Sequence, residues 1–158
     1  MRQEIIMSNL RKLIATLAVM AMALTTFTSP SWAGSGSQSQ IVQAVNAIRQ
    51  HNGLPPLQLH PSLQRAAAEQ AKLMAQSGKM SHKVGYGHGF KARLKRAGFR
   101  GLAAENIAHG QKSLGRVLKG WLASPGHRRN MLHPRMRYFG LSAKKSGGGN
   151  YWAMVLGG

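Results

Sequence analysis

The order of hydrophobic patterns along this chain is the feature that most constrains its fold. Its final stretch, YFGLSAKKSGGGNYWAMVLGG, alternates as two strands would on either side of a glycine-rich loop, which predicts an antiparallel hairpin. The preceding segments instead carry apolar residues at helical spacing, and strands and helices do not alternate along the chain. Helices first and strands last favour an α+β fold over a parallel α/β sheet.

The first two expected helices flank a proline-rich connection. Apolar residues recur at helical spacing over 41–48, and Gly53 with the following LPPL ends this helix in an extended segment. Pro61 suits the first turn of a second helix, which carries an apolar stripe and ends near Gly78. Three consecutive alanines, 66–68, predict that another element packs very close to the second helix.

Two further helices are expected before the hairpin. Residues 90–99 place apolar side chains on one side and basic side chains on the other, which predicts a short basic helix. The segment 102–110 is brief and bounded by glycines, so we expect it to be extended. A fourth helix over 114–122 must be interrupted by Pro125, and Ser124 followed by Pro125 is typical of a new helical start.

The first 33 residues have the pattern of a secretory signal peptide. Arg11 and Lys12 precede the apolar run 13–24, and the small-residue site SWA ends at Ala33. The run falls short of the ~20 residues that a membrane-spanning helix needs, which favours cleavage after Ala33 over a permanent anchor. We therefore expect a secreted or otherwise extracytoplasmic protein.

The expected organisation is a signal peptide over 1–33, a flexible leader over 34–40 and one domain over 41–158. Translation can start at Met1 or at Met7, because the segment before the apolar run is unusually long. The chain contains no cysteine, although an exported protein can form disulfides. Thiol catalysis, cysteine-ligated zinc and iron–sulfur clusters are thereby excluded.

Acidic residues are almost absent. The chain has 22 Lys and Arg against three carboxylates, Glu4, Glu69 and Glu105, and its formal charge is +19. A calcium loop or a glycosidase site needs at least two carboxylates facing one ligand, which this composition makes hard to supply. Glu69 has Arg65 four residues before it and Lys72 three after, the spacing of a solvated helix face. Glu105 is the remaining candidate for carboxylate chemistry.

Five sequence motifs occur in a characteristic order: VNAIRQHNGLPPLQLHPSLQRAAAEQAKLMAQSGKMSH, ENIAHG, WLASPGHRRNML, FG and YW. Together they cover nearly the whole chain after the leader. In this order and spacing the sequence resembles the CAP superfamily, also called the SCP/PR-1-like domain, in its compact bacterial form. The resemblance implies an α-β-α sandwich with a central antiparallel sheet between helical layers, and a cleft lined by two histidines and up to two glutamates.

Carried onto this sequence, the resemblance places a triad of His82, Glu105 and His127 in the cleft. A second family glutamate often lies three residues after a tryptophan, and that position is Ser124 here. The expected neighbours of the triad in the cleft are Ser124, His88 and Asn106. The other histidines are expected to be solvated or terminal: His51, His60, His109 and His133.

The residues of the triad leave three interpretations open. Glu105 can accept an N–H from one or both imidazoles and so brace three distant chain segments. His82 and His127 can instead ligate a metal, most suitably Zn²⁺, although the positive charge of the protein repels a divalent cation. A serine hydrolase would use Ser81 or Ser124 as the nucleophile, but neither lies in a GxSxG turn. No catalytic residue is therefore assigned.

Basic residues are densest over 91–100 and 128–137. Such clusters attract anionic partners, and outside the membrane these include lipopolysaccharide, acidic glycans, wall polymers, released DNA and lipid surfaces. No motif for sequence-specific nucleic-acid recognition is present. We expect a monomeric binding module at the cell envelope or outside the cell, with a metal-dependent or serine hydrolase as the alternative. The predicted polyanion-binding residues are Lys91, Lys95, Arg96, Arg100, Arg128 and Arg129.

Overall fold

The structure is a computed structural model that describes residues 38–158. The predicted signal peptide and the first part of the predicted leader, through residue 37, lie outside the described residues. Among the described helices, none is both long enough and apolar enough to span a bilayer.

The helices and strands of residues 38–158 follow the predicted order, with small differences at the boundaries. The first helix starts at Gln38, within the segment predicted as a flexible leader, and the third ends at Arg96 rather than near residue 99. The segment around Glu105 is a strand, as expected for an extended segment. The elements are α2 (Gln38–His51), β1 (Gln58–Leu59), α3 (Pro61–Ser77), α4 (Phe90–Arg96), β2 (Ala103–His109), α5 (Leu114–Ala123), α6 (Pro125–Met131), β3 (Tyr138–Ser146) and β4 (Gly149–Gly157).

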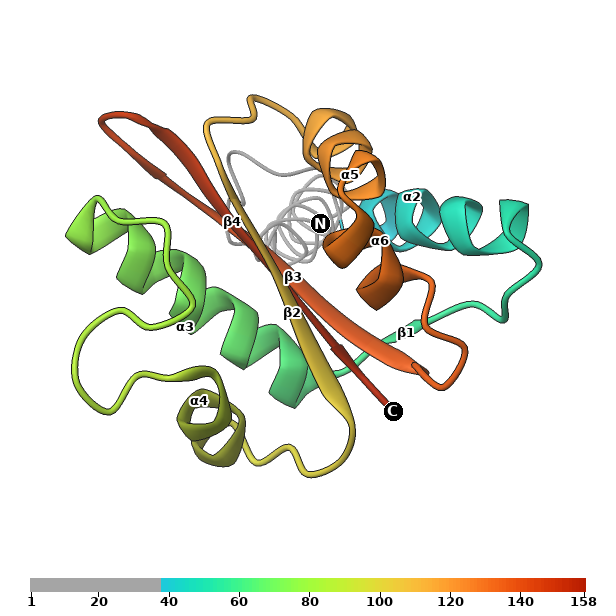
Figure 1. Ribbon diagram of the computed structural model, residues 1–158, viewed down its shortest axis with the longest axis horizontal. Helices are drawn as coiled ribbons and strands as arrows, with labels where there is room; N and C mark the ends of the chain where they lie inside the picture. The colour runs from blue at the N-terminus through green and yellow to red at the C-terminus, as the bar shows by residue number, and fades with distance from the viewer. Residues whose placement is uncertain (1–37) are drawn as a thin grey trace, which may run out of the picture. The chain divides into compact units, whose positions relative to one another are not determined.

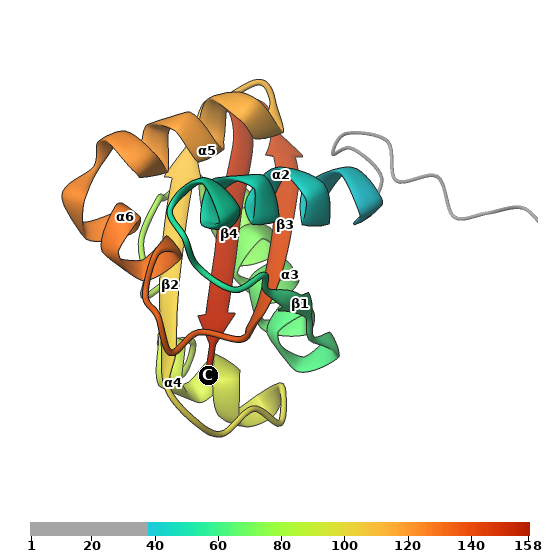
Figure 2. The ribbon, with the colours of Figure 1, turned by 90° about the vertical axis from the view of Figure 1, so that its right-hand side faces the viewer.

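The four strands form one sheet in the order β1-β3-β4-β2. The predicted hairpin pairs β3 with β4, and β4 pairs on its other side with β2, both antiparallel, while the short β1 runs parallel to β3. Helices α3 and α4 cover one face of the sheet, and α2, α5 and α6 cover the other (Figures 1 and 2). This arrangement confirms the predicted α+β sandwich and leaves β2 as an edge strand.

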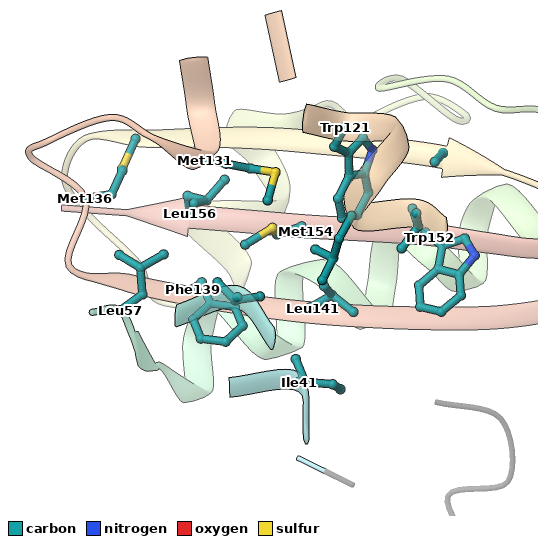
Figure 3. Packing of buried hydrophobic residues seen from close by; sticks show 14 residues of the cluster. Ile41, Leu57, Trp121, Met131, Met136, Phe139, Leu141, Trp152, Met154 and Leu156 are labelled. Carbon is teal, nitrogen blue, oxygen red and sulfur yellow. The ribbon is translucent and has the colours of Figure 1, made fainter. Parts of the chain in front are cut away.

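The core between the sheet and α2, α5 and α6 is built from large side chains. Alternate residues of β4, namely Trp152, Met154 and Leu156, point to this face and are fully buried. Figure 3 shows them beside Trp121 of α5 and the side chains that β3 contributes. Because β4 is central in the sheet, both of its faces are covered and apolar. Successive residues of β4 therefore alternate between the cores on the two sides of the sheet.

On the opposite face, α3 lies unusually close to the sheet. Ala66 and Ala67 are fully buried there, which confirms the close approach that the alanine run predicts. At Gly140 of β3, a Cβ atom would lie only 2.3 Å from the backbone nitrogen of Gln64 and from the carbonyl carbon of Leu63. A glycine is therefore required where the helix backbone rests on the strand.

Local signals fix the ends of the helices that frame the site. Pro61 opens α3, the ring nitrogen Nδ1 of His60 accepts the N–H of Ser62 at 3.2 Å, and Gly78 closes the helix with a φ of 67°. Of the two positions expected for His60, solvated or terminal, the structure shows the terminal one, because this residue caps α3. The predicted new start at Pro125 is confirmed, because α5 ends at Ala123 and α6 begins at Pro125.

Candidate functional site

The candidate site is built around β2. Successive side chains of this strand point to opposite faces of the sheet, so the residues of the site lie on two sides. Glu105 and Asn106 are paired in register with Val155 and Met154 of β4, so their side chains point to opposite faces of the sheet. Glu105 faces the side of α3 and α4, where Val155 is part of the core, and Asn106 faces the side of α5 and α6. Groups reach the site from both faces around the free edge of the strand.

Glu105 is held from two directions. Its side chain is only 2% exposed, and its Oε1 lies 2.8 Å from Nδ1 of His82. The other oxygen, Oε2, accepts a hydrogen bond of 2.5 Å from Nη2 of Arg93, whose side chain is fully buried. A charged carboxylate in this position is balanced by a buried guanidinium, and the more exposed imidazole of His82 completes its set of partners.

Arg93 is the functional residue that the sequence analysis missed. Residues 90–99 are predicted to direct their basic side chains to solvent, yet Arg93 lies on the apolar side of α4 with Leu94, and both are buried. The signal was present, because Arg93 falls three residues after Phe90 and four before Ala97, on the helical stripe of buried residues. A basic residue in such a stripe predicts a buried partner, and Glu105 is that partner.

His127 does not bind Glu105, which corrects one form of the predicted triad. No hydrogen bond joins the two residues in the described part of the chain; Nδ1 of His127 instead lies 3.0 Å from Oγ of Ser124. Asn106 donates from Nδ2 to the backbone carbonyl of His127 at 3.0 Å and so positions α6. Partial burial lowers the pKa of His127 below its ordinary value, and electrostatic repulsion from His82 lowers this pKa further.

Asn130 is a second residue without a prediction. From α6 its Nδ2 donates to Oδ1 of Asn106 at 2.8 Å, so the two amides link the helix to the edge strand. Trp121 adds a third link, because its indole N–H donates to the carbonyl of Ile107 at 3.1 Å. These bonds explain why β2 and the helices α5 and α6 keep a fixed spacing at the site.

An open pocket of about 280 Å³ lies along β2 beside His127. Ser124 and His127 line it, whereas Glu105, Asn106, His82 and His88 are not among its lining residues. His109, expected to be solvated or terminal, is the last residue of β2; it borders the pocket, and its ring stacks on Tyr151 at a centroid distance of 4.1 Å. The remaining lining is largely apolar and includes Met80, Ile107 and Trp121.

Glu69 and His88 form a second carboxylate cluster away from the pocket. The carboxylate of Glu69 accepts a 2.6 Å hydrogen bond from Nη2 of Arg96, and His88 Nδ1 lies 3.4 Å from the same oxygen. Glu69 therefore pairs with residues from another segment rather than with Arg65 or Lys72, and His88 is not in the cleft. Both carboxylates of the described fold are thus bound by one histidine of the loop 79–89 and one arginine of α4.

The donor set does not fit a zinc site. Both oxygens of Glu105 are engaged by His82 and Arg93, which leaves two imidazoles as ligands at the edge of β2. Among residues 38–158, no three or more His, Cys, Asp or Glu side chains are grouped so that they could hold a metal ion. The residues present therefore provide fewer ligands than a catalytic zinc centre uses.

A Ser-His-Glu triad is not assembled either. Ser124 and His127 are within hydrogen-bond distance, but the carboxylate that would orient the imidazole is bound to His82 instead. The other candidate nucleophile, Ser81, donates from its Oγ to the carbonyl of Lys83 at 3.0 Å, and within residues 38–158 it makes no hydrogen bond with a histidine side chain. The serine and histidine pair alone lacks the third member on which hydrolytic triads depend.

The predicted polyanion-binding residues form two surfaces. Lys91, Lys95 and Arg100 are exposed on and after α4, whereas Arg96 is held by Glu69 and by the carbonyl of Gly87. Arg128 and Arg129 are exposed on α6, on the other side of the sheet (Figure 2). There they line a hollow of about 350 Å³ together with Leu132, His133 and Pro134.

Comparisons with known proteins point to one family. The family model described as CAP, the Cysteine-rich secretory protein family, matches residues 42–156. The protein YkwD of Bacillus subtilis (strain 168) is 35% identical over 124 residues, which are 78% of this chain and 48% of that protein. The chain thus spans about half the length of this curated relative.

Solved structures agree with the family match. An extracellular protein containing a SCP domain from Bacillus anthracis is 28% identical, with a TM-score of 0.69 over 75% of this chain and 39% of that chain. An outer surface protein of Borrelia burgdorferi shares the fold with a TM-score of 0.67 at 21% identity, over 75% of this chain and 90% of that chain.

Proposed function

The chain belongs to the CAP family, and on this basis we propose that it is an exported module that binds anionic polymers of the cell envelope or its surroundings. The observation that supports the proposal is that both carboxylates of the described residues are held in ion pairs. Glu69 and Glu105 are both neutralised by an arginine and a histidine, so neither offsets the lysines on the surface. The exposed cations of α4 and α6 therefore face solvent as uncompensated positive charge.

A binding role fits the site better than catalysis does. A general base must be free to take a proton, but both oxygens of Glu105 are occupied, one by His82 and the other by Arg93. The pocket along β2 is mainly apolar and contains the Ser124 and His127 pair without an acid. These features support a role in recognition, with the carboxylate as a brace.

Export is part of the proposal. The signal pattern that ends at Ala33 supports it, as does the description of the B. anthracis relative as extracellular. Outside the membrane, the anionic polymers within reach are lipopolysaccharide, acidic glycans and wall polymers. All present repeated phosphate, carboxylate or sulfate-like charges that lysine and arginine can bind without sequence-specific recognition.

The proposal predicts a salt-dependent interaction with a soluble polyanion. We expect residues 34–158 to bind dextran sulfate with an affinity that falls steeply between ~50 and ~200 mM salt, because bound cations release counterions. The triple replacement of Lys91, Lys95 and Arg100 by Gln should reduce the slope of log affinity against log salt by about one for each cation that contacts the polymer. Isothermal titration at several salt concentrations measures both quantities.

Neighbouring residues on α4 provide the control. Lys95→Gln and Arg96→Gln remove one charge each, but Arg96 is already occupied by Glu69 and by a backbone carbonyl. Lys95→Gln should therefore reduce the slope more than Arg96→Gln does. Binding of dextran sulfate that is absent, or that does not change with salt, would contradict the proposed function.

A further inference from the structure

The loop over residues 79–89 carries two of the large hydrophobic side chains that are exposed in the described fold. Three large hydrophobic side chains are exposed across residues 38–158, and two of them, Met80 and Tyr86, lie in this loop. Tyr86 is 104% exposed, so its ring is completely surrounded by solvent, and Met80 is 55% exposed. A side chain of this size held completely in solvent has no role in the stability of the fold.

The turn that presents Tyr86 is built from glycines. Gly85 and Gly87 flank the tyrosine with φ values of 78° and 74°, a left-handed conformation that residues with a Cβ rarely adopt. The chain turns at residues 86–87, and the side chain of Tyr86 is fully exposed at this turn. Both glycines are therefore needed to hold the tyrosine in this position.

The backbone of the loop is held in place near both of its ends. His82 binds Glu105, and Arg93 donates to the carbonyl of His82 at 3.1 Å and also to the carbonyl of His88. Near the other end, His88 binds Glu69, and an arginine of α4 donates to the carbonyl of residue 87 at 2.9 Å. The two carboxylate clusters therefore fix the loop from both sides, and docking through it costs little ordering entropy.

Lysines supply exposed positive charges in the loop and at the start of α4. Lys79 and Lys83 are exposed in the loop itself, and Lys91 follows at the start of α4. The nearby carboxylates, Glu69 and Glu105, are already occupied by arginine and histidine. The loop thus combines a fully exposed aromatic ring with exposed lysines. Tyrosine prefers the headgroup level of a bilayer, and lysine binds the anionic headgroups there.

We propose that the loop 79–89 is a preformed contact for the surface of an anionic lipid bilayer. The ring of Tyr86 enters the headgroup region, and Lys79 and Lys83 bind lipid phosphates. The inference rests on the proposed function for its electrostatic attraction, and it adds a specific partner and a specific contact. A single aromatic residue with a few lysines gives weak and reversible attachment, so the domain would sample the membrane rather than remain on it.

A tryptophan introduced at the tip tests the contact directly. Trp121 and Trp152 are buried, so Tyr86→Trp in residues 34–158 places an exposed indole where its emission reports its surroundings. Vesicles of phosphatidylglycerol and phosphatidylcholine should shift this emission to shorter wavelength, and brominated lipids should quench it. Vesicles of phosphatidylcholine alone should have neither effect, because the attraction to the headgroup charge is absent.

Cosedimentation with the same vesicles gives the affinities. Tyr86→Ser should weaken binding by about tenfold, a loss that reflects the ring and not folding, because the ring is fully exposed. Lys79→Gln and Lys83→Gln should each weaken it by about fivefold.

Matched control variants lie elsewhere on the molecule. Tyr138→Ser removes another exposed tyrosine, and the pair Lys144→Gln and Lys145→Gln removes lysines of the hairpin. These variants keep the tip intact and lower the overall charge by no more than the tip variants do together. They should bind the vesicles within about twofold of the unaltered protein, since distant charges are screened.

The outcomes separate this inference from the proposed function. Binding of dextran sulfate without binding of the anionic vesicles would overturn the membrane contact and leave the proposed function in place. Equal vesicle binding by Tyr86→Ser and the unaltered protein would also overturn it. If dextran sulfate shifts the indole emission as much as the vesicles do, the tip is a platform for glycans and the lipid contact is wrong. If neither partner binds, both proposals fail.

Discussion

Glu105 is one of three acidic residues in the chain, and its contacts explain why a carboxylate is retained there. Arg93 of α4 is completely buried, and a guanidinium without a counter-charge in that position would be severely destabilising. Glu105 supplies the charge, and the same group orients His82 and the start of the loop 79–89. The residue therefore acts as a brace, and its loss would affect both stability and the presentation of the loop.

Glu105→Gln is expected to lower the free energy of unfolding by about 3 to 5 kcal/mol, because it leaves the Arg93 charge buried and unpaired. Glu69→Gln is the matched control, since Glu69 also binds one arginine and one histidine. There the Glu69 and Arg96 side chains are 30% and 44% exposed, and solvent screening should limit the loss to about 1 kcal/mol or less. Urea unfolding monitored by the fluorescence of the buried tryptophans measures both changes.

A double-mutant cycle identifies the dominant partner. Arg93→Met and Glu105→Gln should be strongly non-additive, because each change removes the partner of the other. The cycle of His82→Ala with Glu105→Gln should show a smaller coupling, since the imidazole is 53% exposed. A larger coupling for His82 than for Arg93 would mean that the imidazole, and not the buried guanidinium, sets the need for the carboxylate.

At the scale of elements, the close approach of α3 to the sheet sets the position of the whole site. The loop 79–89 leaves from the end of α3, and both the α4 arginines and Glu69 depend on where this helix lies. The spacing is set by small residues on both partners, Ala66 and Ala67 on the helix and Gly140 on β3. A larger side chain at this contact would move the helix and the loop together.

Gly140→Ala should destabilise the protein by about 3 kcal/mol, because the added methyl group meets the backbone of α3 and cannot be relieved by a change of rotamer. Gly115→Ala in α5 is the control, since nothing lies within 4 Å of the added methyl group there. It should stabilise the protein by up to about 1 kcal/mol through helix propensity. Thermal unfolding of the two variants would show shifts of melting temperature in opposite directions, and equal shifts would contradict the close-contact interpretation.

At the scale of the whole molecule, the fold relies on its two cores alone. The chain contains no cysteine, and the apolar residues on the two faces of the sheet form one cluster against α2, α5 and α6 and another against α3 and α4. A two-sided core of this kind is sufficient for a domain of ordinary size to fold without disulfides. The large positive charge opposes self-association, which favours a monomer.

Residues 34–158 are therefore expected to form a monomer that unfolds in one cooperative transition. Calorimetry should give equal calorimetric and van't Hoff enthalpies, and light scattering after gel filtration should give the monomer mass. The melting temperature should be the same with and without a reducing agent, since the chain has no cysteine. An aggregated or gradually melting product would show that the segment before residue 34 is needed for folding.

The sequence by itself determined the elements and their order. Periodicity located the helices and the hairpin, Pro61, Gly78 and Pro125 marked their ends, and the alanine run indicated the close contact of α3. These signals are local, because a helix face or a cap depends on residues a few positions apart. The family resemblance supplied the fold, which the structure confirms.

Only the tertiary structure decided how the side chains of the site are paired. His82, Glu105 and His127 were predicted together, but β2 turns Glu105 towards α4 and leaves His127 with Ser124 on the other face. The pairing of Arg93 with Glu105 joins α4 to β2, and that contact exists only once α3 and the sheet have brought them together. Sequence spacing determines which residues share a face of one element, whereas the packing of elements determines which charges meet.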